Sequence, residues 1–512
     1  MPNVRVVPNV KPGFLAPQLP AEAPQHPEDW SVILKDVRDK IMPGLTNWQS
    51  PNFLAFFPAG VTYPSILGEI FSAAFNAPAF NWLCSPVCTE METVVLDQLA
   101  KSLGLPEEFL SSGEGGGVIQ GSASEAIVVA MVAARERSVN SLLAKEGLLP
   151  VSPDDSEEII LKREDRTMEI RSKLVALGSS QSHSSTQKAA MVLGVRYRTI
   201  QVGHDTGCAL TAEQLSAAVA KYESQGLVPF YVTATIGTTS TCAVDDLAGI
   251  TEYKRSHEML WVHIDAAYAG AALICPELRG QCQAQYLKHV DSFDVNMHKW
   301  LLVNFDASCM YVRRRADLID ALSISPSYLL NPAGLSGLVK DYRDWQIPLG
   351  RRFRSLKIWF VLRSYGIQGM QDMVREHIRI GEVFGELCRS QRAREAGIVV
   401  VAGPVFALNV FRILPQPVAG NAEVPSVTPV ANDFTNQVYE AINDKGDIYL
   451  THSLIDGIDC IRVVGANPNT QEKYLRRAFD IIVETTEEIR GANHAIGTNG
   501  HLINGTEALT PA

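Results

Sequence analysis

Lys299 and Asp265 are the residues whose types and spacing point most directly to chemistry. Lys299 lies in Ser292–Trp300, where a run of mostly apolar, strand-like residues brings one lysine toward a closed site. Asp265 lies 34 residues earlier, at the end of a second apolar run, Leu260–Asp265. A lysine amine can form a Schiff base with an aldehyde, and a carboxylate can keep a pyridine nitrogen protonated. The pair therefore suits an enzyme that holds pyridoxal phosphate (PLP).

Each of these two residues also has a plainer explanation. A lysine in an apolar run commonly packs its stem at the core edge and extends its ammonium to water, although Lys299 has little polar surface nearby to reach. Asp265 could cap the turn that follows it. The small residues Ala266 and Ala267 leave room for a flat ring beside the carboxylate. A strand-end lysine near this carboxylate favours the cofactor over the cap.

The segment Gly115–Ala126 is rich in glycine and precedes a predicted helix that runs to about Arg137. Ser122 and Glu125 have the spacing of a capping box. Free N–H groups and the dipole at a helix N-terminus favour an anion such as a phosphate. The spacing fits neither Gly-x-Gly-x-x-Gly nor a P-loop, so nucleotide binding is disfavoured. An ordinary capped helix after a glycine loop is the alternative.

His183, within Ser182–Thr186, is a third candidate, although it could be a loop histidine without a chemical role. A metal site built from His183, His263, Asp265 and His298 is a further alternative, but no His-Glu-x-x-His spacing supports it. The nine cysteines are scattered and contain no Cys-x-x-Cys. They are expected to be free buried thiols.

The composition is that of a globular protein with a large core, since 46% of the 512 residues are apolar and 20% are charged. A net charge of −11 and the lack of a long basic run argue against nucleic acid as a partner. The first 27 residues contain seven prolines and no apolar signal segment. No run approaches the roughly 18 apolar residues that span a membrane. We therefore expect a soluble, cytoplasmic protein that does not bind membranes.

The chain is predicted to have five parts. They are a Pro-rich arm (1–28), a helical segment (29–103), a large domain (104–375), a small α/β domain (376–490) and a disordered tail (491–512). In the large domain, strands at 173–177, 230–235, 260–265 and 308–312 alternate with helices such as 211–222, for which Thr211 and Gln214 form a capping box. This alternation predicts a mostly parallel sheet covered on both faces. The small domain is predicted to have strands at 398–401, 405–413 and 460–464 and a helix at 471–490.

The chain resembles the group II PLP-dependent decarboxylases, specifically the aromatic L-amino-acid decarboxylases, over about residues 28–490. The matching segments are Gly117–Ala126, Gln181–Ser185, Thr235–Thr239, His263–Gly270, Asn296–Ser308 and Asp341–Ser355, several of them long and nearly verbatim. The resemblance implies the aspartate-aminotransferase-like fold (fold type I), an α/β fold. It also implies a homodimer in which the N-terminal segment wraps the partner.

The resemblance implies a role for each candidate residue. Lys299 becomes the Schiff-base lysine and Asp265 the partner of the pyridine nitrogen. His183 stacks on the cofactor ring, and Ala267 packs on its other face. Tyr328 lies on a mobile loop that closes over the site and protonates the α-carbon. The other implied cofactor contacts are Ala123, Ser124, Asn296 and His298 around the phosphate and Thr239 near the ring substituents.

The implied substrate wall is aromatic. It comprises Trp48, Phe56, Phe57, Pro58 and Phe80, with His183 and Gly350. Burying an aromatic ring there is worth roughly 4–6 kcal/mol before ordering costs, whereas a glutamate side chain would lose its hydration without a cationic partner. Gly350 leaves space for a bicyclic ring, and Phe56 removes a hydroxyl that relatives with catechol substrates carry. Both residues favour tryptophan, although Gly350 could be a turn glycine and Phe53 and Phe57 could be core residues.

The expected reaction is PLP-dependent decarboxylation of L-tryptophan to tryptamine and CO2. Further substrates to consider are 5-hydroxytryptophan, phenylalanine, tyrosine and DOPA. An aromatic aldehyde synthase on the same scaffold is the first alternative, but such relatives usually alter the loop tyrosine or the stacking histidine, and this chain keeps Tyr328 and His183. A non-catalytic binding homologue is the second alternative, and no chemical group is lost that would support it.

Overall fold

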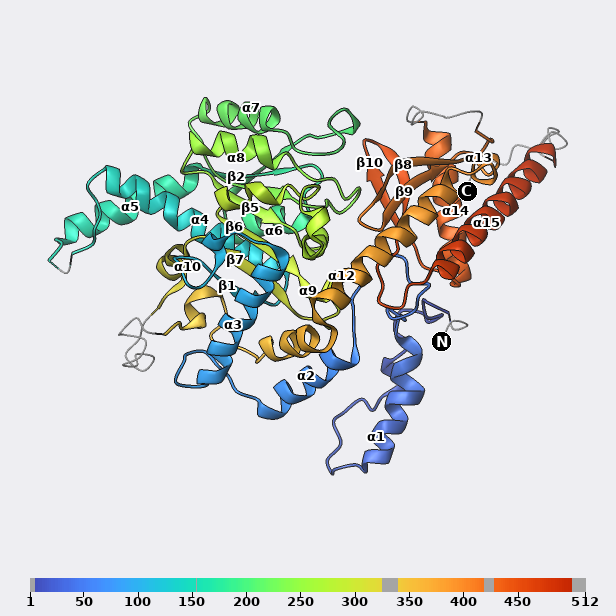
Figure 1. Cartoon of the computed structure of the whole chain (residues 1–512), viewed down its shortest axis with the longest axis horizontal. Coiled ribbons are helices and arrows are strands. Elements are labelled where there is room, and N and C mark those ends of the chain that lie inside the picture. Colours follow the sequence, from blue (N-terminus) through green and yellow to red (C-terminus); the bar gives the residue numbers. More distant parts are fainter. Residues whose placement is uncertain (1–4, 153, 325–338, 419–427, 500–512) are drawn as a thin grey trace, which may run out of the picture. The chain divides into compact units, whose positions relative to one another are not determined.

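The computed structural model describes residues 5–152, 154–324, 339–418 and 428–499, so Tyr328 lies outside the described residues. The chain forms two compact units, which Figure 1 shows in sequence colours. One unit comprises residues 59–376, and the other comprises residues 1–58 together with 377–512. The division after residue 376 lies one residue from the predicted domain boundary. The predicted helical segment 29–103 contributes to both units.

A seven-stranded sheet forms the centre of the unit 59–376, in the order β1-β7-β6-β5-β4-β2-β3. Its strands are β1 (Gly116–Gln120), β2 (Leu174–Ser179), β3 (Arg196–Ile200), β4 (Val228–Thr235), β5 (Trp261–Asp265), β6 (Ser292–Asn296) and β7 (Ser308–Val312). Strand β7 is antiparallel to both of its neighbours, and the other paired neighbours are parallel. The predicted α/β fold with a mostly parallel sheet is confirmed.

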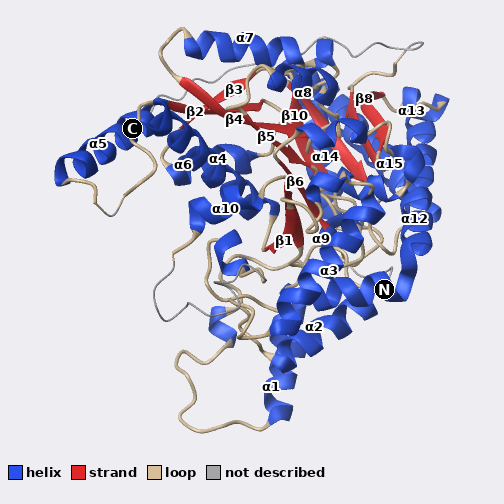
Figure 2. Ribbon diagram, turned by 60° about the vertical axis from the view of Figure 1, so that its left-hand side comes forward, coloured by secondary structure: helices blue, strands red, loops and turns tan. Residues whose placement is uncertain are grey.

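Helices cover both faces of this sheet, as the sequence predicts. Figure 2 shows α7 (Ala212–Glu223) and α8 (Leu247–Arg255) on one side of the strands, with α4 (Ala123–Lys145), α6 (Ser184–Leu193) and α10 (Arg315–Leu322) on the other. Residues of β5 and β6 are buried throughout, because side chains of both orientations meet covering helices. The helix α4 packs its alanine, valine and isoleucine side chains into one core with Tyr231, Trp261 and Met310.

Further helices complete this unit. They are α2 (Tyr63–Phe75), α3 (Pro86–Leu103), α5 (Glu157–Lys173), α9 (Met297–Trp300) and the first part of α12 (Ser355–Cys388). Short 3-10 helices are η4 (Glu107–Phe109), η5 (His204–Thr206), η6 (Ala269–Ile274), η7 (Pro276–Leu278), η8 (Ala284–His289) and η10 (Tyr342–Trp345). The helix α12 is interrupted at Gly366, whose φ of 64° and ψ of 170° are not helical. Glycine adopts this conformation without a side-chain clash.

Two predicted helix caps have different outcomes. The capping box of Thr211 and Gln214 at α7 is present in both directions, which confirms the prediction. At α4, the Ser122 hydroxyl accepts the N–H of Glu125, but the Glu125 carboxylate accepts the N–H of Gly121 at 2.9 Å. The prediction of a full capping box at Ser122 is therefore wrong. The glutamate reaches back to the last glycine of the loop and holds it against the helix.

The unit formed by 1–58 and 377–512 contains a four-stranded antiparallel sheet in the order β10-β11-β9-β8. Its strands are β8 (Ile398–Val405), β9 (Leu408–Ile413), β10 (Thr451–Ile455) and β11 (Ile458–Val464). Its helices are α1 (Trp30–Asp36), α13 (Gln391–Glu395), α14 (Pro429–Lys445), α15 (Glu472–Asn499), the end of α12, and the short η1 (Ala16–Gln18), η2 (Val37–Ile41) and η3 (Met42–Gly44). The helix α15 continues nine residues beyond the predicted end at 490, into the predicted tail.

All nine cysteines are free, and eight of them are buried, as the sequence predicts. Within the described ranges no helix is long and apolar enough to cross a bilayer.

Candidate active site

Of the predicted catalytic residues, Asp265, Lys299 and His183 lie at the carboxyl edge of the seven-stranded sheet, and Tyr328 is outside the described residues. Asp265 ends β5, Asn296 ends β6 and Thr235 ends β4, and these three strands are parallel and adjacent. Lys299 follows within three residues of the end of β6, on the short helix α9. In open α/β sheets the carboxyl ends of parallel strands face the crevice in which ligands bind. The topology thus brings together residues that are far apart in the sequence.

The Asp265 carboxylate is held in a defined place. It is 6% exposed, and its Oδ1 atom accepts the N–H of Ala267 at 3.0 Å. The N–H of Ala266 donates to the carbonyl of Asp294, and that of Asn296 donates to the carbonyl of Ala267. Asp265 therefore caps its turn, as one interpretation of the sequence expects. Because only Oδ1 makes this cap and the carboxyl group is buried at the strand end, the turn-cap interpretation and the cofactor interpretation of Asp265 are compatible.

His183 lies within electrostatic range of both Lys299 and Asp265. Loss of hydration is the main reason that the pKa of His183 is lowered, Lys299 lowers it further, and Asp265 opposes the shift. His183 is the N-cap of α6, where its Nδ1 accepts the N–H of Ser185 at 3.2 Å. With Nδ1 acting as acceptor, the neutral ring carries its proton on Nε2. The loop histidine is thus both a cap and a neutral donor near the lysine.

The start of α4 has the features of an anion site. Its first N–H groups, those of Ala123 and Ser124, have no intrahelical acceptor.

His298, which is 5% exposed, accepts the N–H of Ala307 on Nδ1 at 2.9 Å, so its Nε2 carries the proton. Burial lowers the pKa of His298 to about 4, and Lys299 contributes in the same direction. His298 is therefore a neutral hydrogen-bond donor.

Several buried polar atoms at this edge lack a protein partner. Among the described residues, Oγ1 of Thr235, Oδ1 of Asn296 and Oε1 of Gln181 are buried without a hydrogen bond. Such atoms are uncommon in native proteins and indicate a missing ligand or water. Beside them, Ala267 offers a small, buried methyl group that a flat ring can cover. A buried anion, a lysine and unsatisfied polar atoms together fit PLP.

The predicted substrate wall is divided between the two units. Trp48, Phe56, Phe57 and Pro58 belong to the unit of 1–58 and 377–512, whereas Phe80, His183 and Gly350 belong to the unit of 59–376. Each set is therefore described by itself, and their meeting in one wall stays a prediction.

The aromatic residues of the first set form a cluster. The Trp48 ring lies 5.9 Å from that of Phe56 in a stacked arrangement, and the Arg462 guanidinium lies over the ring of Phe57. Phe56 is 45% exposed, which suits a residue of a ligand wall. Phe53 is 2% exposed and packs with Val6, Ala55 and Tyr449, so it is a core residue.

Gly350 is not required by the backbone. It does not have a positive φ, and a Cβ atom added to it would meet no atom of the described residues within 4 Å. Neither backbone strain nor packing against the described residues therefore explains the absence of a side chain at this position. This observation argues against the turn-glycine interpretation.

The sequence analysis missed a buried polar layer beneath the site. Asp245 accepts the N–H groups of Leu210 and Thr235 at 2.7 and 2.8 Å and so anchors the end of β4. Burial raises the pKa of Asp245 to about 7. His263 pairs with Ser292 at 2.8 Å, and Asp294 accepts a hydrogen bond from Ser308 at 2.6 Å. The sequence did contain a signal for the strand residues of this layer. Polar residues occupy every second position of the otherwise apolar strands β5 and β6, on the face that carries Asp265.

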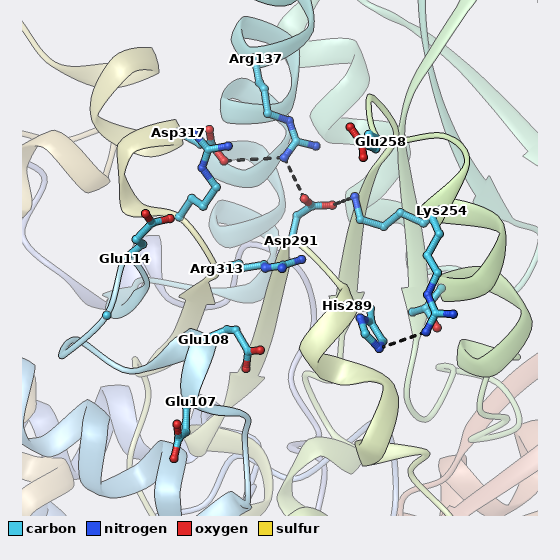
Figure 3. A pocket seen from close by; sticks show the side chains of 14 residues that line it. Glu107, Glu108, Glu114, Arg137, Lys254, Glu258, His289, Asp291, Arg313 and Asp317 are labelled. Carbon is cyan, nitrogen blue, oxygen red and sulfur yellow. Dashed lines mark hydrogen bonds and ion pairs between the residues drawn. The ribbon is translucent and has the colours of Figure 1, made fainter.

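A separate charged cavity of about 850 Å³ lies at the opposite edge of the same sheet (Figure 3). Arg137 and Lys254 point toward Asp291 from two sides, with N–O distances of 2.8 and 2.6 Å. Asp291 directly precedes β6, so this cluster is at the amino end of the strand. The cluster is an ion-pair network at the amino ends of the strands, remote from Lys299.

The sequence left open a metal site built from His183, His263, Asp265 and His298. No group of three or more His, Cys, Asp or Glu residues in the described part of the chain could hold a metal ion. His263 is engaged with Ser292 and His298 with Ala307, each through Nδ1.

Comparison with known proteins identifies the family of this chain. The pyridoxal-dependent decarboxylase conserved domain matches residues 12–413. Tyrosine decarboxylase 2 of Narcissus pseudonarcissus is 40% identical over 93% of this chain and 88% of its own length. Phenylacetaldehyde synthase of Arabidopsis thaliana is 40% identical over 94% and 90%. The crystal structure of Oryza sativa TDC with PLP and tryptamine superimposes with a TM-score of 0.85 at 35% identity, covering 96% of this chain and 94% of that one.

The chain belongs to the pyridoxal-dependent decarboxylase family. Its relatives place it in the aromatic amino-acid decarboxylase family, and it is a carboxy-lyase with the fold type I architecture and PLP as its cofactor. The expected family, fold class, enzyme class and cofactor are confirmed. The comparisons include both amine-forming and aldehyde-forming relatives, so the choice of amino acid and product is a separate question.

Proposed function

We propose that this protein decarboxylates aromatic L-amino acids to amines and that L-tryptophan, which gives tryptamine and CO2, is its preferred substrate. The observation that supports this proposal best is the convergence of Lys299, Asp265 and His183 at the carboxyl edge of one sheet. This reaction requires three groups from the protein: a lysine to hold the cofactor aldehyde, an anion to face the ring nitrogen, and a neutral imidazole to donate a proton.

The residues of the sheet edge would hold the cofactor. When bound, PLP supplies an electron-withdrawing ring that accepts the electron pair left by the departing carboxyl group. Asp265 would face the ring nitrogen, and Lys299 would hold the aldehyde carbon. His183 and Ala267 would cover the two faces of the ring. The expected phosphate and substituent contacts are Ala123, Ser124, Asn296, His298 and Thr239.

Proton delivery would fall to His183 and Tyr328. His183 presents Nε2–H as a neutral donor, because Nδ1 accepts from Ser185 and the pKa of His183 is lowered chiefly by burial. A neutral donor close to the α-carbon suits protonation after CO2 leaves. Tyr328 is the expected second donor, outside the described residues. Closure of the site would exclude water and suppress side reactions.

The tryptophan preference is supported by Gly350 and Phe56. Space at Gly350 is not taken by any described side chain, and a wider ring system can use it. Phe56 exposes an apolar ring without a hydroxyl to pair with a catechol. Aromatic contacts at the wall would stabilise an indole by roughly 4–6 kcal/mol before ordering costs.

An assay with all five candidate amino acids tests the proposal. Tryptophan, 5-hydroxytryptophan, tyrosine, phenylalanine and DOPA compete in one reaction, and kcat/KM ratios follow from the amines formed. We expect tryptophan to have the highest kcat/KM. A clear preference for DOPA would contradict the roles of Gly350 and Phe56. The Lys299→Met variant, which cannot hold the aldehyde, is the control and is expected to form no amine.

Aldehyde formation is the second candidate, because phenylacetaldehyde synthase is 40% identical to this chain. Decarboxylation with oxidative deamination would release ammonia and hydrogen peroxide along with CO2. We expect CO2 and amine in equal amounts with little peroxide. Peroxide equal to CO2 would favour the aldehyde synthase. The Tyr328→Phe variant is expected to divert turnover toward the aldehyde.

We also propose that the active form is a homodimer located in the cytoplasm. Among the described residues, α1 exposes Trp30 and Leu34, and α2 exposes Tyr63, Ile70 and Phe75. Large apolar side chains grouped on a helix surface are typical of an interface. Light scattering is expected to give twice the chain mass of 56.0 kDa. A mass equal to a single chain would contradict the homodimer.

A further inference from the structure

Asp265 has a second aspartate directly beside it. In the parallel pairing of β5 and β6, Asp265 is in register with Asp294. Paired residues of adjacent strands extend their side chains from the same face of a sheet, and the strands are about 5 Å apart. Asp294 is 0% exposed and Asp265 is 6% exposed. Two carboxyl groups thus share one buried region at the carboxyl edge of the sheet.

Asp294 has only one hydrogen-bond partner among the described residues. Its Oδ1 accepts the Ser308 hydroxyl at 2.6 Å, and its Oδ2 is buried without a partner. No ion pair to Asp294 occurs among the described residues. A buried carboxylate with one neutral donor is costly, and a second anion beside it increases that cost. The surroundings therefore favour the acid form of Asp294.

The groups that face Asp294 supply little positive charge. His263 is two residues before Asp265 on the same face, and burial lowers its pKa to about 4, so it is neutral. The helix α4, which packs on this face, buries apolar residues such as Ala126, Ala130 and Met131. On β7, the residues that share this face with Asp294 are Ser308 and Met310, which carry no charge, whereas Cys309 and Tyr311 extend from the opposite face.

Two charged groups remain near Asp294, and their effects oppose each other. Burial raises the pKa of Asp294 to about 8, the Ser308 hydrogen bond lowers it, the Asp265 charge raises it and the Lys299 charge lowers it. In contrast, Asp265 belongs to the cofactor site and caps its own turn through Ala267. The surroundings thus favour the protonated form of Asp294, whereas Asp265 is the carboxyl that belongs to the cofactor site.

We propose that Asp294 is a positioning residue that acts through Asp265: it keeps its proton, so the pair carries one negative charge, and Asp265 alone presents that charge to the ring nitrogen of PLP. Loss of this proton at alkaline pH places a second negative charge behind the ring. That charge favours the cationic forms of the cofactor nitrogens. The two carboxyls and the cofactor then titrate as a coupled system.

This inference rests on Asp265 facing the cofactor, but it does not depend on which aromatic amino acid is used. The first test is infrared difference spectroscopy between the wild-type holoenzyme and the Asp294→Asn variant. Below neutral pH the difference is expected to contain the carbonyl stretch of a protonated carboxyl group, and this band is expected to disappear at alkaline pH. Absence of the band below neutral pH would overturn the proposal.

The second test is a pH titration of the cofactor absorbance without substrate, in the wild type and in two variants. Asp294→Asn keeps the shape of the side chain but cannot ionise. Ser308→Ala keeps the carboxyl group but removes the hydroxyl that favours its ionised form. We expect the wild type to show an alkaline transition that Asp294→Asn lacks and that Ser308→Ala moves to higher pH.

The outcomes separate this inference from the proposed function. A wild-type protein that binds no PLP would contradict the cofactor site itself. A wild type that binds PLP, with a titration curve that Asp294→Asn reproduces, would overturn only the role of Asp294. If Asp294→Asn fails to fold, Ser308→Ala decides alone: a shift to higher pH supports the proposal, and an unchanged curve overturns it.

Discussion

The Nδ1 atom of His183 accepts the backbone N–H of Ser185 at 3.2 Å, and the Ser185 hydroxyl lies 2.7 Å from the same atom. This contact fixes the ring at the start of α6 and directs Nε2 away from the helix. Because Nδ1 is occupied, the neutral ring has one available donor. The cap of a helix thereby sets the tautomer of a candidate proton donor.

A pH profile of kcat tests this ionisation state. The pKa of His183 is lowered chiefly by burial, so the neutral ring persists to lower pH than for an ordinary histidine, near 6.5. Activity that needs the neutral ring is lost as pH falls through this lowered pKa. We expect the acid limb of kcat to lie below the ordinary histidine value in the wild type and to be missing in His183→Gln. An acid limb at or above that value would contradict a neutral His183.

Replacing His183 by phenylalanine separates stacking from proton transfer. A phenyl ring retains a flat face for the cofactor but cannot donate a proton. We expect PLP affinity to stay within a few-fold of wild type while kcat falls about 10²- to 10⁴-fold, the usual contribution of a positioned acid or base. The control is His183→Ala, which should weaken PLP binding as well. Equal kcat in wild type and His183→Phe would remove His183 from the proton pathway.

Asp265→Asn tests the buried anion at the end of β5. The amide can still accept the N–H of Ala267 and cap the turn, but it cannot balance a positive ring nitrogen. We expect kcat to fall at least about 100-fold, or roughly 2.7 kcal/mol, with the fold retained. Steady-state kinetics and circular dichroism measure the two effects. Asp265→Glu, which keeps the charge, is expected to recover part of the activity, and an active Asp265→Asn would reduce Asp265 to a turn cap.

The sequence predicted the parts of this site that depend on local patterns. Lys299 and Asp265 stood out because each follows an apolar run that becomes a buried strand, and alternation of strands and helices predicted the parallel sheet. The pairing of Asp265 with Asp294, and of Asp294 with Ser308, depends on register between strands far apart in sequence. A single sequence does not specify that register. The hydrogen bond from the Gly121 N–H to the Glu125 carboxylate was also missed. A capping box predicts that this carboxylate accepts the N–H of Ser122, but it accepts the N–H one residue earlier.

Substrate selectivity is expected to respond to Gly350 in a defined direction. A serine there would fill space that no described atom occupies within 4 Å and would add a hydroxyl. We expect Gly350→Ser to lower kcat/KM for tryptophan relative to tyrosine by about 10- to 100-fold, the range for small changes in pocket shape. Gly491, also without a neighbour within 4 Å, offers the control Gly491→Ser, with an unchanged ratio. A ratio unaltered by Gly350→Ser would place Gly350 outside the wall.

The ion pairs of Asp291 are expected to stabilise the fold without affecting catalysis. Asp291 accepts from Lys254 Nζ at 2.6 Å, from Arg137 at 2.8 Å and from the N–H of Val262 at 2.8 Å, all at the edge remote from Lys299. Removing one partner of a buried ion pair typically costs about 3–5 kcal/mol, and because Asp291 keeps its pair with Arg137 when Lys254 is replaced, we expect the lower end, about 3 kcal/mol. Lys254→Met keeps the apolar stem and should lower the free energy of unfolding in urea by about that amount at fixed protein concentration.

The next residue on the same helix provides the matched control for this last prediction. Arg255 is exposed and pairs with Glu252 at the surface, so Arg255→Met should change the free energy of unfolding by no more than roughly 1 kcal/mol. Although burial opposes it, the charges of Arg137 and Lys254 hold the pKa of Asp291 below its usual value. The stabilisation is therefore present above the unfolded-state pKa and is lost as pH falls through the folded-state pKa. Equal destabilisation by both variants, or loss of kcat in Lys254→Met with its fold intact, would contradict a purely structural network.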